Sequence, residues 1–335
     1  MKKILITGMT GFVGSWLSLL LFSKNYKVYG ISLKNDNPLH IYNKTKISKY
    51  CNSYICDITD YKKLSKIFYK IKPDITIHLA AQPLVVKSYS EPLSTFYTNI
   101  LGTLNILNLA SKMSSGRVIN FTSDKVYKEK NKKTFDENDE LGGYDPYSLS
   151  KSCSDLLGQC INLNNKNINN LKTSTIRCGN LIGGGDWSEN RLIPDYYASF
   201  LNKKTLTIRY PQYIRPWQHV INPISIILQI IKKNNPKFYD TFNIGPNKNN
   251  YNVKYIINKL NKINKNREVK LKYNNLYKLK ETKFLKLNNS KSKKIFNYPI
   301  SNINKDLFIT NDWYLNSFKK GSLTDFTLEQ IYNYI

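Results

Sequence analysis

The sequence has few cysteines, no long apolar run and little negative charge. Its five cysteines include no CxxC pair and no metal-ligand spacing, and their odd number argues against a disulfide framework. No segment reaches the roughly 20 apolar residues that a membrane-spanning helix needs. Lys2 and Lys3 precede an apolar stretch, but glycines interrupt it and no small-residue cleavage site follows, so we do not interpret it as a signal peptide. We expect a cytoplasmic protein with no membrane partner and no bound metal.

Acidic residues are scarce, since 51 lysines and arginines stand against 23 aspartates and glutamates and give a net charge of +28. Such an excess can indicate a nucleic acid, an anionic membrane or an acidic ligand as partner. Here the lysines alternate with Asn, Ile and Tyr, for example in residues 164–172 and 254–272, which is typical of an AT-rich coding bias. Because no nucleic-acid motif accompanies them, we expect no nucleic-acid partner. Salt-dependent retention on DNA tests that alternative, and loss of retention at modest salt would indicate nonspecific attraction only.

Short apolar runs alternate with segments of helical spacing along the first half of the chain. We expect strands at 3–7, 27–32, 53–56, 75–79, 117–122 and 173–177, and helices at 11–23, 61–70, 91–113 and 145–163. This alternation predicts a doubly wound α/β fold, in which helices cover both faces of a parallel sheet. From about residue 181 the pattern is less regular and rich in proline, which predicts a smaller mixed α/β region there.

Three glycines mark the turn between the first strand and the first helix. Gly8, Gly11 and Gly14 stand where a dinucleotide-binding fingerprint must stand, because glycines let the backbone approach a pyrophosphate at the helix N-terminus. Structural glycines in a tight turn are the alternative. Asp57 and the segment from His78 to Gln82 follow later strands, at the edge where open α/β sheets bind ligands. We therefore expect a Rossmann-type dinucleotide site.

Tyr147 and Lys151 are four residues apart, so a helix places both side chains on one face. A lysine ammonium beside a phenol favours the phenolate, which makes Tyr147 a candidate base. An exposed Tyr and Lys pair is the alternative. Ser123 follows a predicted strand and can orient a sugar hydroxyl against Tyr147. Asp124 and Lys125 come next, and an acid and a base at this position suggest proton chemistry in addition to hydride transfer.

Several longer strings add a resemblance. TGMTGFVGSWLSL, HLAAQPLV, TSDKVY, LGGYDPYSLSK, RCGNLIGGGDW, NRLIPD and IRPWQHV are spread over nearly the whole chain. The GxxGxxG spacing and the Ser, Tyr and Lys set resemble the extended short-chain dehydrogenase/reductases, the NAD-dependent epimerase/dehydratase family. GGGDW, RLIPD and RPWQHV are more specific and resemble its CDP-glucose 4,6-dehydratase branch.

The resemblance implies a Rossmann domain at 1–180, to which about 219–245 returns, and a nucleotide-sugar-binding domain at 181–335. It implies an NAD-dependent hydro-lyase that oxidises C4 of CDP-glucose, eliminates water across C5 and C6 and returns the hydride to C6. The implied catalytic residues are Ser123, Asp124, Lys125, Tyr147 and Lys151, where Lys125 replaces the glutamate of the dTDP-glucose enzymes. The implied cofactor-binding residues are Gly8, Thr10, Gly11, Phe12, Val13, Gly14, Asp57, Ile58, Leu79, Ala80, Ala81, Gln82, Asn99, Thr122, Tyr147 and Lys151. The implied substrate-binding residues are Ser88, Tyr89, Glu137, Asn180, Arg191, Leu192, Ile193, Pro194, Arg215, Gln218 and His219.

Some positions depart from the pattern of the family. Met9, Val13 and Lys34 stand where it suggests His, Lys and Asp, and the end of the second strand reads SLKND, so NADP is not excluded. The alternative functions are a sugar-nucleotide 4-epimerase or 4-reductase on the same scaffold, or an inactive dinucleotide-binding protein. Relatives pair through two long helices, which implies a homodimer or homotetramer through residues 91–113 and 145–163.

Overall fold

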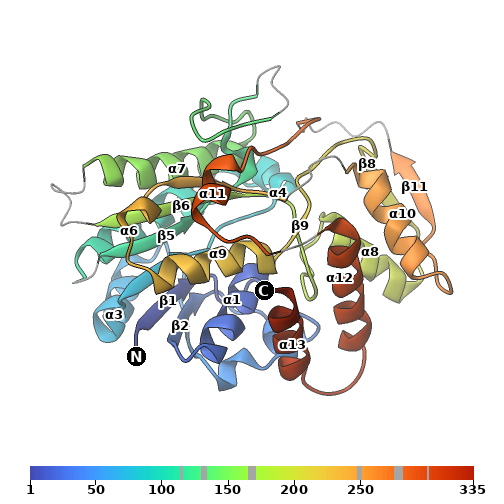
Figure 1. Ribbon diagram of the computed structural model, residues 1–335, viewed down its shortest axis with the longest axis horizontal. Helices are drawn as coiled ribbons and strands as arrows, with labels where there is room; N and C mark the ends of the chain where they lie inside the picture. Colours follow the sequence, from blue (N-terminus) through green and yellow to red (C-terminus); the bar gives the residue numbers. More distant parts are fainter. Residues whose placement is uncertain (114–115, 130–133, 165–170, 247–250, 275–281, 300–301) are drawn as a thin grey trace.

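A seven-stranded parallel sheet forms the centre of the protein (Figure 1). The computed structural model describes residues 1–113, 116–129, 134–164, 171–246, 251–274, 282–299 and 302–335. The strands lie in the order β10, β6, β5, β4, β1, β2, β3, and all neighbouring pairs are parallel. Their bounds are β1 (Lys3–Thr7), β2 (Lys27–Ser32), β3 (Asn52–Ile55), β4 (Ile75–His78), β5 (Arg117–Phe121), β6 (Lys172–Cys178) and β10 (Thr241–Ile244). This is the predicted Rossmann-type sheet.

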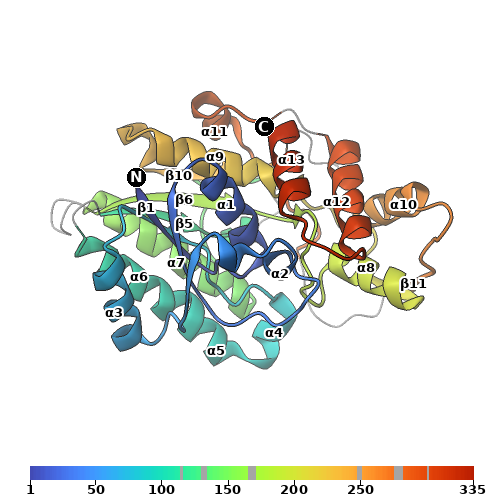
Figure 2. The same ribbon diagram turned by 90° about the horizontal axis from the view of Figure 1, so that it is seen from below.

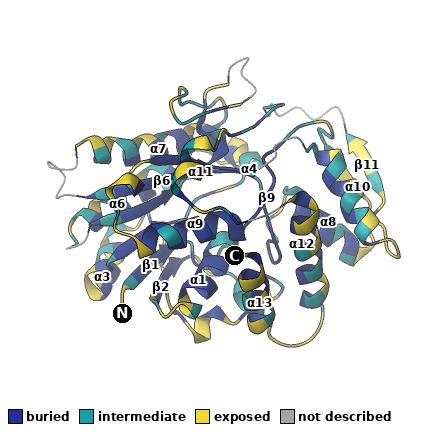
Figure 3. Ribbon diagram, in the orientation of Figure 1, coloured by how far each residue is buried: buried dark blue, intermediate teal, exposed yellow. Residues whose placement is uncertain are grey.

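Helices cover both faces of the sheet, so its central strands are buried on both sides, whereas the edge strand β3 is largely exposed (Figures 2 and 3). Within β1, Ile4 and Ile6 pack with residues of α1 (Phe12–Ser23) and α9 (Ile221–Lys232). Leu5 points the other way and packs with residues of α3 (Tyr61–Ile71) and α6 (Gly102–Ser111). Successive side chains of a strand alternate between faces, so a strand buried on both faces must be apolar at every position, as ILI is.

The order of the sheet reverses between β1 and β4, and the functional turns lie at the carboxyl ends of these strands. The helical segment that follows β4 runs from α5 (Pro92–Phe96) through a π-helical turn, η2 (Tyr97–Leu101), into α6. The sequence predicts one helix for 91–113, and the structure inserts this wider turn into it. Beside it lies α7 (Pro146–Leu163), which begins one residue after its cap, Asp145, whose Oδ1 accepts from Ser148 N at 2.9 Å.

A smaller lobe lies beyond the carboxyl edge of the sheet (Figure 1). Its strands β8 and β11 are parallel, and its core combines aliphatic and aromatic side chains, with Tyr197 and Tyr314 stacked at 3.7 Å between ring centroids. Gly184 lies against Trp313 of the lobe, because a Cβ at Gly184 would fall 2.1 Å from that ring. The elements of the lobe are α8 (Leu192–Asn202), β8 (Leu206–Arg209), α10 (Val253–Ile263), β11 (Leu271–Asn274) and α12 (Ile303–Ser317).

Short elements complete the chain between the sheet and the lobe. The strands β7 and β9 form a parallel pair of their own. After β9 the chain returns to the main sheet as α9 and β10, while the division into two domains stays a prediction. The remaining elements are α2 (Ile41–Lys44), η1 (Ile47–Lys49), α4 (Val85–Ser90), η3 (Asp124–Val126), β7 (Leu181–Ile182), β9 (Gln218–His219), η4 (Pro236–Phe238), α11 (Ser290–Ile295) and α13 (Thr324–Tyr334).

Two further features concern membranes and metals. Over the described ranges no helix combines the length and apolar character needed to cross a bilayer. In the same ranges no group of three or more His, Cys, Asp or Glu side chains is arranged to hold a metal ion. The five cysteines are not joined by disulfides.

Candidate active site

The glycine turn after β1 forms a cradle in which side chains are excluded. Gly8 has φ +75°, and a Cβ there would lie 2.9 Å from the amide nitrogen of Ala80. A Cβ at Gly14 would lie 2.2 Å from the carbonyl oxygen of Gly8. The first N–H groups of α1 begin at this turn and have no partner within the helix, which makes them donors for an anion. The turn therefore fits the pyrophosphate of a dinucleotide.

A cavity of about 450 Å³ lies next to this turn. Asp57 and Ile58 line it on the side of β3, and Asp57 Oδ1 accepts from Thr59 N and Thr59 Oγ1 at 2.8 Å each. The predicted cofactor residues on its wall are Gly8, Thr10, Gly11, Phe12, Val13, Gly14, Asp57, Ile58, Leu79, Ala80 and Ala81. A cavity beside a glycine cradle at the carboxyl edge of the sheet fits an adenine dinucleotide.

The end of β2 carries no carboxylate toward this cavity. Ser32 lies there, and its Oγ accepts from Thr10 N at 3.0 Å. Asn35 Nδ2 donates to the Thr10 carbonyl at 3.0 Å, while Lys34 forms an exposed ion pair with Asp36 at 2.8 Å. An acidic residue at this place commonly binds the ribose 2′-hydroxyl of NAD, and here the position offers a hydroxyl and amides instead.

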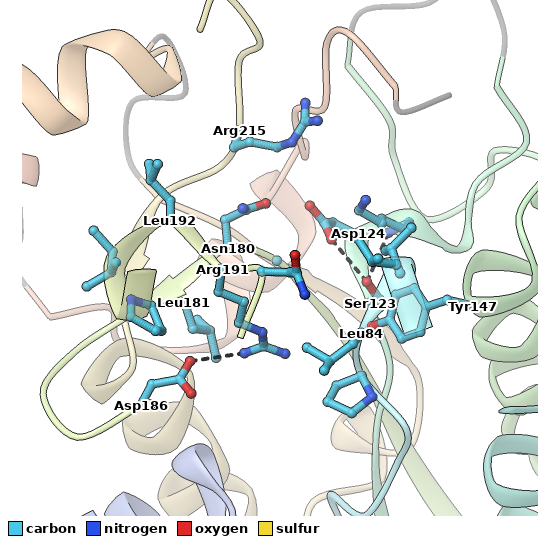
Figure 4. A pocket seen from close by; sticks show the side chains of 18 of the residues that line it. Leu84, Ser123, Asp124, Tyr147, Asn180, Leu181, Asp186, Arg191, Leu192 and Arg215 are labelled. Carbon is cyan, nitrogen blue, oxygen red and sulfur yellow. Dashed lines mark hydrogen bonds and ion pairs between the residues drawn. The ribbon is translucent and has the colours of Figure 1, made fainter. Parts of the chain in front are cut away.

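A second cavity, of about 340 Å³, adjoins the first and contains the predicted catalytic residues (Figure 4). Tyr147 and Lys151 reach it from the same face of α7, and both are buried. Lys151 Nζ donates to the carbonyl oxygen of Phe121, the last residue of β5, at 2.9 Å. The sheet and the helix thus fix the Lys151 ammonium at the wall of the cavity.

Ser123 and Asp124 enter the cavity from the carboxyl end of β5 (Figure 4). Ser123 Oγ donates to Asp124 Oδ1 at 3.1 Å and accepts from Lys125 N at 3.2 Å. Asp124 is 2 % exposed, and its Oδ2 has no hydrogen-bond partner among the described residues. A buried carboxyl oxygen without a partner is costly unless the carboxyl is protonated or a ligand binds it.

Burial changes the protonation of these groups. It raises the pKa of the Asp124 carboxyl above its ordinary value, which favours the acid form. Burial also raises the pKa of Tyr147 to about 12, opposed by the neighbouring Ser123 hydroxyl, and lowers the pKa of Lys151 to about 8, opposed by Asp155. Asp124 is thus suited to donate a proton, whereas Tyr147 needs additional positive charge nearby to act as a base.

Gln82 and Asn99 lie behind the cavities instead of on their walls. Gln82 N donates to Asn99 Oδ1 at 2.8 Å, and Asn99 Nδ2 donates to Ser150 Oγ on α7 at 2.8 Å. Asn99 belongs to the π-helical turn, a feature frequent near functional sites. Thr122 lines the second cavity, and its Oγ1 donates to Asp155 at 2.8 Å. A direct role of Gln82 and Asn99 in cofactor binding stays a prediction.

The lobe contributes the opposite wall of the second cavity (Figure 4). Arg191 NH1 contacts Asp186 Oδ2 at 3.2 Å, and Arg191 lines both cavities. Arg215 NH1 donates to the carbonyl oxygens of Ile214 at 3.0 Å and Thr282 at 2.7 Å. The predicted substrate residues on this wall are Asn180, Arg191, Leu192, Ile193, Pro194 and Arg215.

Five predicted substrate residues do not line either cavity. Ser88 is fully buried on α4, beside the half-exposed Tyr89. Glu137 Oε1 accepts from Asn243 N at 2.8 Å. Gln218 Nε2 donates to the carbonyl oxygen of Ile244 at 2.7 Å.

Of these five residues, His219 has the contacts most typical of a packed core residue. It is fully buried, packs edge-on against Trp16, and burial lowers its pKa to about 3, so it is neutral. These contacts account for it as a packed residue, and its contact with substrate stays a prediction, as it does for the other four.

Sequence reasoning missed several residues of the site. Thr7 Oγ1 contacts His78 Nδ1 at 2.8 Å and accepts from the amides of Leu79 and Ala80, so it fixes the loop that borders the cofactor cavity. Asp195 lines the substrate cavity, and burial raises its pKa to about 6. Thr7 gives no sequence signal, because threonine is ordinary in a strand. Asp195 stands within the RLIPD string, which was its only signal.

Comparison with known proteins agrees with this geometry. A sequence model of the GDP-mannose 4,6 dehydratase family matches residues 5–301. The chain is 38% identical over 270 residues to the CDP-glucose 4,6-dehydratase of Salmonella typhimurium, an alignment that covers 77% of this chain and 75% of that protein.

Solved structures share the fold. A UDP-glucose 4-epimerase from Thermotoga maritima superposes with a TM-score of 0.82 at 22% identity, covering 95% of this chain and 100% of that one. A dTDP-glucose 4,6-dehydratase from Bacillus anthracis, in complex with NAD, gives 0.79 at 23% identity, covering 94% and 97%. The sheet order, the glycine cradle and the extent of the sequence match lead to one conclusion: this chain belongs to the sugar-nucleotide 4,6-dehydratase family of extended short-chain dehydrogenase/reductases.

Proposed function

We propose that the protein is an NAD-dependent hydro-lyase that converts CDP-glucose to CDP-4-keto-6-deoxyglucose. The observation that carries this proposal is the buried carboxyl of Asp124 beside Ser123 and Tyr147 on one cavity wall. Oxidation and epimerisation at C4 need a base and a hydroxyl donor, but expulsion of the 6-hydroxyl also needs an acid. The 38% identity to a CDP-glucose 4,6-dehydratase supports the same reaction and the same nucleotide.

Tyr147 begins the reaction by removing the proton from the 4-hydroxyl, with Ser123 as the donor that orients this oxygen. Lys151, fixed by the Phe121 carbonyl at 2.9 Å, supplies positive charge that favours the Tyr147 phenolate. NAD, when bound, supplies the acceptor that takes a hydride from C4 and later gives it to C6. The glycine cradle at the N-terminus of α1 would hold its pyrophosphate.

Asp124 then donates its proton to the 6-hydroxyl oxygen as the bond from C6 to oxygen breaks, and water leaves. The 4-keto group acidifies the C5 proton, and Lys125 follows Asp124 directly, which supports its assignment to the removal and return of that proton. The product carries the returned hydride at C6 and a proton at C5. The proton that Tyr147 gains balances the one that Asp124 loses, so exchange with solvent restores both groups.

Arg191 and Arg215 are proposed to bind the diphosphate of the substrate. Guanidinium groups match the geometry of phosphate oxygens, and Asp186 holds Arg191 at the junction of the two cavities. The hydroxyl and amides at the end of β2 leave NADP open as an alternative cofactor.

The test is to incubate the purified protein with CDP-glucose and NAD in deuterated water and to analyse the product by mass spectrometry and NMR. We expect a product that has lost one water and has gained one deuterium at C5. An unchanged mass with inverted C4 would indicate the epimerase instead. Parallel reactions with GDP-mannose, UDP-glucose and dTDP-glucose test the nucleotide, and Asp124→Asn is the matched control. No turnover with any of them, with NAD or NADP, would leave the inactive binding protein as the interpretation.

We also infer that the protein forms a homodimer through the helices beside β5, with a dimer of dimers as the larger form. Exposed apolar side chains lie on neighbouring helices there: Leu93 and Tyr97 are 70% and 61% exposed, and Leu104, Leu149 and Leu156 are 48%, 41% and 50% exposed. The helices α5 and α7 pack on one another, so these residues belong to one side of the molecule. A second copy of the same face would cover them.

Sedimentation of the wild-type protein and of a Leu104→Glu, Leu156→Glu variant tests the dimer. We expect twice the chain mass for the wild type and the chain mass for the variant, with unchanged circular dichroism. A wild-type monomer at micromolar concentration would contradict the proposal. A cytoplasmic location and the absence of a nucleic-acid partner stay predictions.

A further inference from the structure

Gly179 lies where the side chain of Asp124 needs space. It directly follows β6, and β6 pairs with β5, the strand that leads to Asp124. A Cβ at Gly179 would lie 2.0 Å from Cγ and from Oδ2 of Asp124 and 2.5 Å from Oδ1. The carboxyl of Asp124 therefore occupies the volume that any side chain at position 179 would fill.

The surroundings restrict where this carboxyl can go. Ser123 Oγ holds Oδ1 at 3.1 Å, and the carboxyl is almost fully buried. The neighbouring Cys178 is also buried, and its Sγ accepts from Gln218 Nε2 at 3.2 Å. A carboxyl displaced from Gly179 would move toward the open cavity and away from the bond with Ser123.

We propose that Gly179 is a positioning residue, which reserves the place of the Asp124 carboxyl so that its proton reaches the 6-hydroxyl of the substrate. Gly179 also lines the substrate cavity, but it has no side chain that could donate or accept a proton, so it acts through Asp124. The inference rests on the proposed dehydratase function. A side chain at 179 impairs the step in which the bond from C6 to oxygen breaks, and it spares oxidation at C4, which depends on Ser123, Tyr147 and Lys151.

The backbone at position 179 does not itself require glycine. Gly179 is absent from the glycines with positive φ, so an alanine can adopt its backbone conformation. The three nearest atoms that its Cβ would meet all belong to the carboxyl of Asp124, which is a side chain and not backbone. Gly184 differs, because a Cβ there would meet the ring of Trp313, which is fully buried in the core that includes residues of β1, α1 and α9.

The experiment compares Gly179→Ala with wild type on CDP-glucose and on CDP-6-deoxy-6-fluoroglucose. Fluoride leaves without the proton that hydroxide needs, so this analogue bypasses the acid. We expect kcat for CDP-glucose to fall on the order of 100-fold, as for loss of a general acid, and the rate with the fluoro analogue to stay close to wild type. Gly245→Ala is the matched control, because a Cβ there makes only an ordinary contact of 3.4 Å with Leu287, and its activity should equal that of wild type.

A double-mutant cycle separates a positioning role from a general disturbance. Gly179→Ala combined with Asp124→Asn should lose no more activity than Asp124→Asn alone, because both substitutions act on one group. Additive losses, or an equal loss on both substrates, would overturn the inference. So would a Gly179→Ala variant as active as wild type on CDP-glucose.

Folding and the proposed function are tested separately. If Gly179→Ala does not fold, Asp124→Ala with Gly179→Ala should restore the thermal transition, because the colliding carboxyl is gone; failure to restore it would contradict the inference. A wild-type protein that does not dehydrate CDP-glucose would instead refute the proposed function.

Discussion

The two walls of the substrate cavity are built differently. On the wall formed by the sheet and α7, Ser123, Asp124, Tyr147 and Lys151 are at most 9% exposed; Ser123 Oγ donates to Asp124, and Lys151 donates to the last carbonyl of β5. On the wall formed by the lobe, the side chain of Arg191 is 35% exposed, whereas Arg215 is buried and donates to two backbone carbonyl oxygens. The first wall has fixed geometry before substrate arrives, and on the second wall the partly exposed Arg191 can adjust to it.

This difference assigns separate tasks to the two walls. Groups that must act at one bond need positions fixed to within a fraction of an ångström, which buried polar networks supply. Groups that bind a flexible diphosphate can tolerate some movement. We therefore expect substitutions on the sheet wall to lower kcat or stability and those on the lobe wall to raise KM.

The largest effect is expected from Tyr147→Phe on the sheet wall. Without the phenol oxygen no group removes the 4-hydroxyl proton, so kcat should fall about 1000-fold with KM nearly unchanged. Steady-state kinetics with CDP-glucose measure this. Tyr144→Phe, three residues earlier and 78% exposed, is the control and should retain wild-type kcat. A KM effect as large as the kcat effect for Tyr147→Phe would break the comparison.

The next largest effect is expected on stability, from a buried ion pair that lies behind the sheet wall. Asp155 on α7 binds Arg177 of β6 at 2.8 Å, both side chains are at most 1% exposed, and Thr122 Oγ1 donates to the same carboxylate. Asp155→Ala leaves a buried guanidinium without its anion, which should cost about 3–5 kcal/mol in the free energy of unfolding. Urea denaturation at neutral pH measures it.

The exposed pair of Lys128 and Glu140 is the control for that measurement. Its side chains are each 48% exposed, so Glu140→Gln should cost less than about 1 kcal/mol. Equal losses in the two variants would show that the sheet wall is no more rigid than the surface.

A smaller effect is expected from Arg191→Met on the lobe wall. Loss of a charged hydrogen bond to phosphate should raise KM roughly 10- to 100-fold, with little change in kcat. Arg267→Met, in which an exposed guanidinium near Phe200 is removed, should change neither constant. A fall in kcat with constant KM would place Arg191 among the groups that act on the reacting bonds.

The sequence predicts the sheet wall better than the lobe wall. Six strands were predicted within one or two residues because buried parallel strands are continuously apolar, as ILI in β1 is. β10 was not predicted as a strand, because it joins the sheet only after the chain has passed through the lobe. Tyr147 and Lys151 follow from helical spacing. The space at Gly179 could not be foreseen, because it depends on a contact between two strand ends 55 positions apart in the sequence.

The last prediction uses the pH dependence of the free energy of unfolding to test whether water reaches the Lys151 ammonium in the sheet wall. Burial lowers the pKa of Lys151 from 10.5 to about 8, so between these pH values the unfolded chain holds one more proton here than the folded protein. Stability rises with pH wherever the unfolded state binds more protons. The free energy of unfolding of wild type minus that of Lys151→Met should therefore be flat below pH 8 and rise between pH 8 and 10.5.

Thermal and urea unfolding of the protein without cofactor, across this pH range, measure that difference. Lys151→Arg keeps its charge throughout, because a guanidinium does not lose its proton in proteins, so its difference from Lys151→Met should stay flat. A wild-type difference as flat as that of the arginine variant would mean that water reaches the Lys151 ammonium in solution. The sheet wall would then be as accessible to water as the lobe wall. If sheet-wall substitutions still lowered kcat and lobe-wall substitutions still raised KM, the cause would be the contacts that each wall makes with substrate.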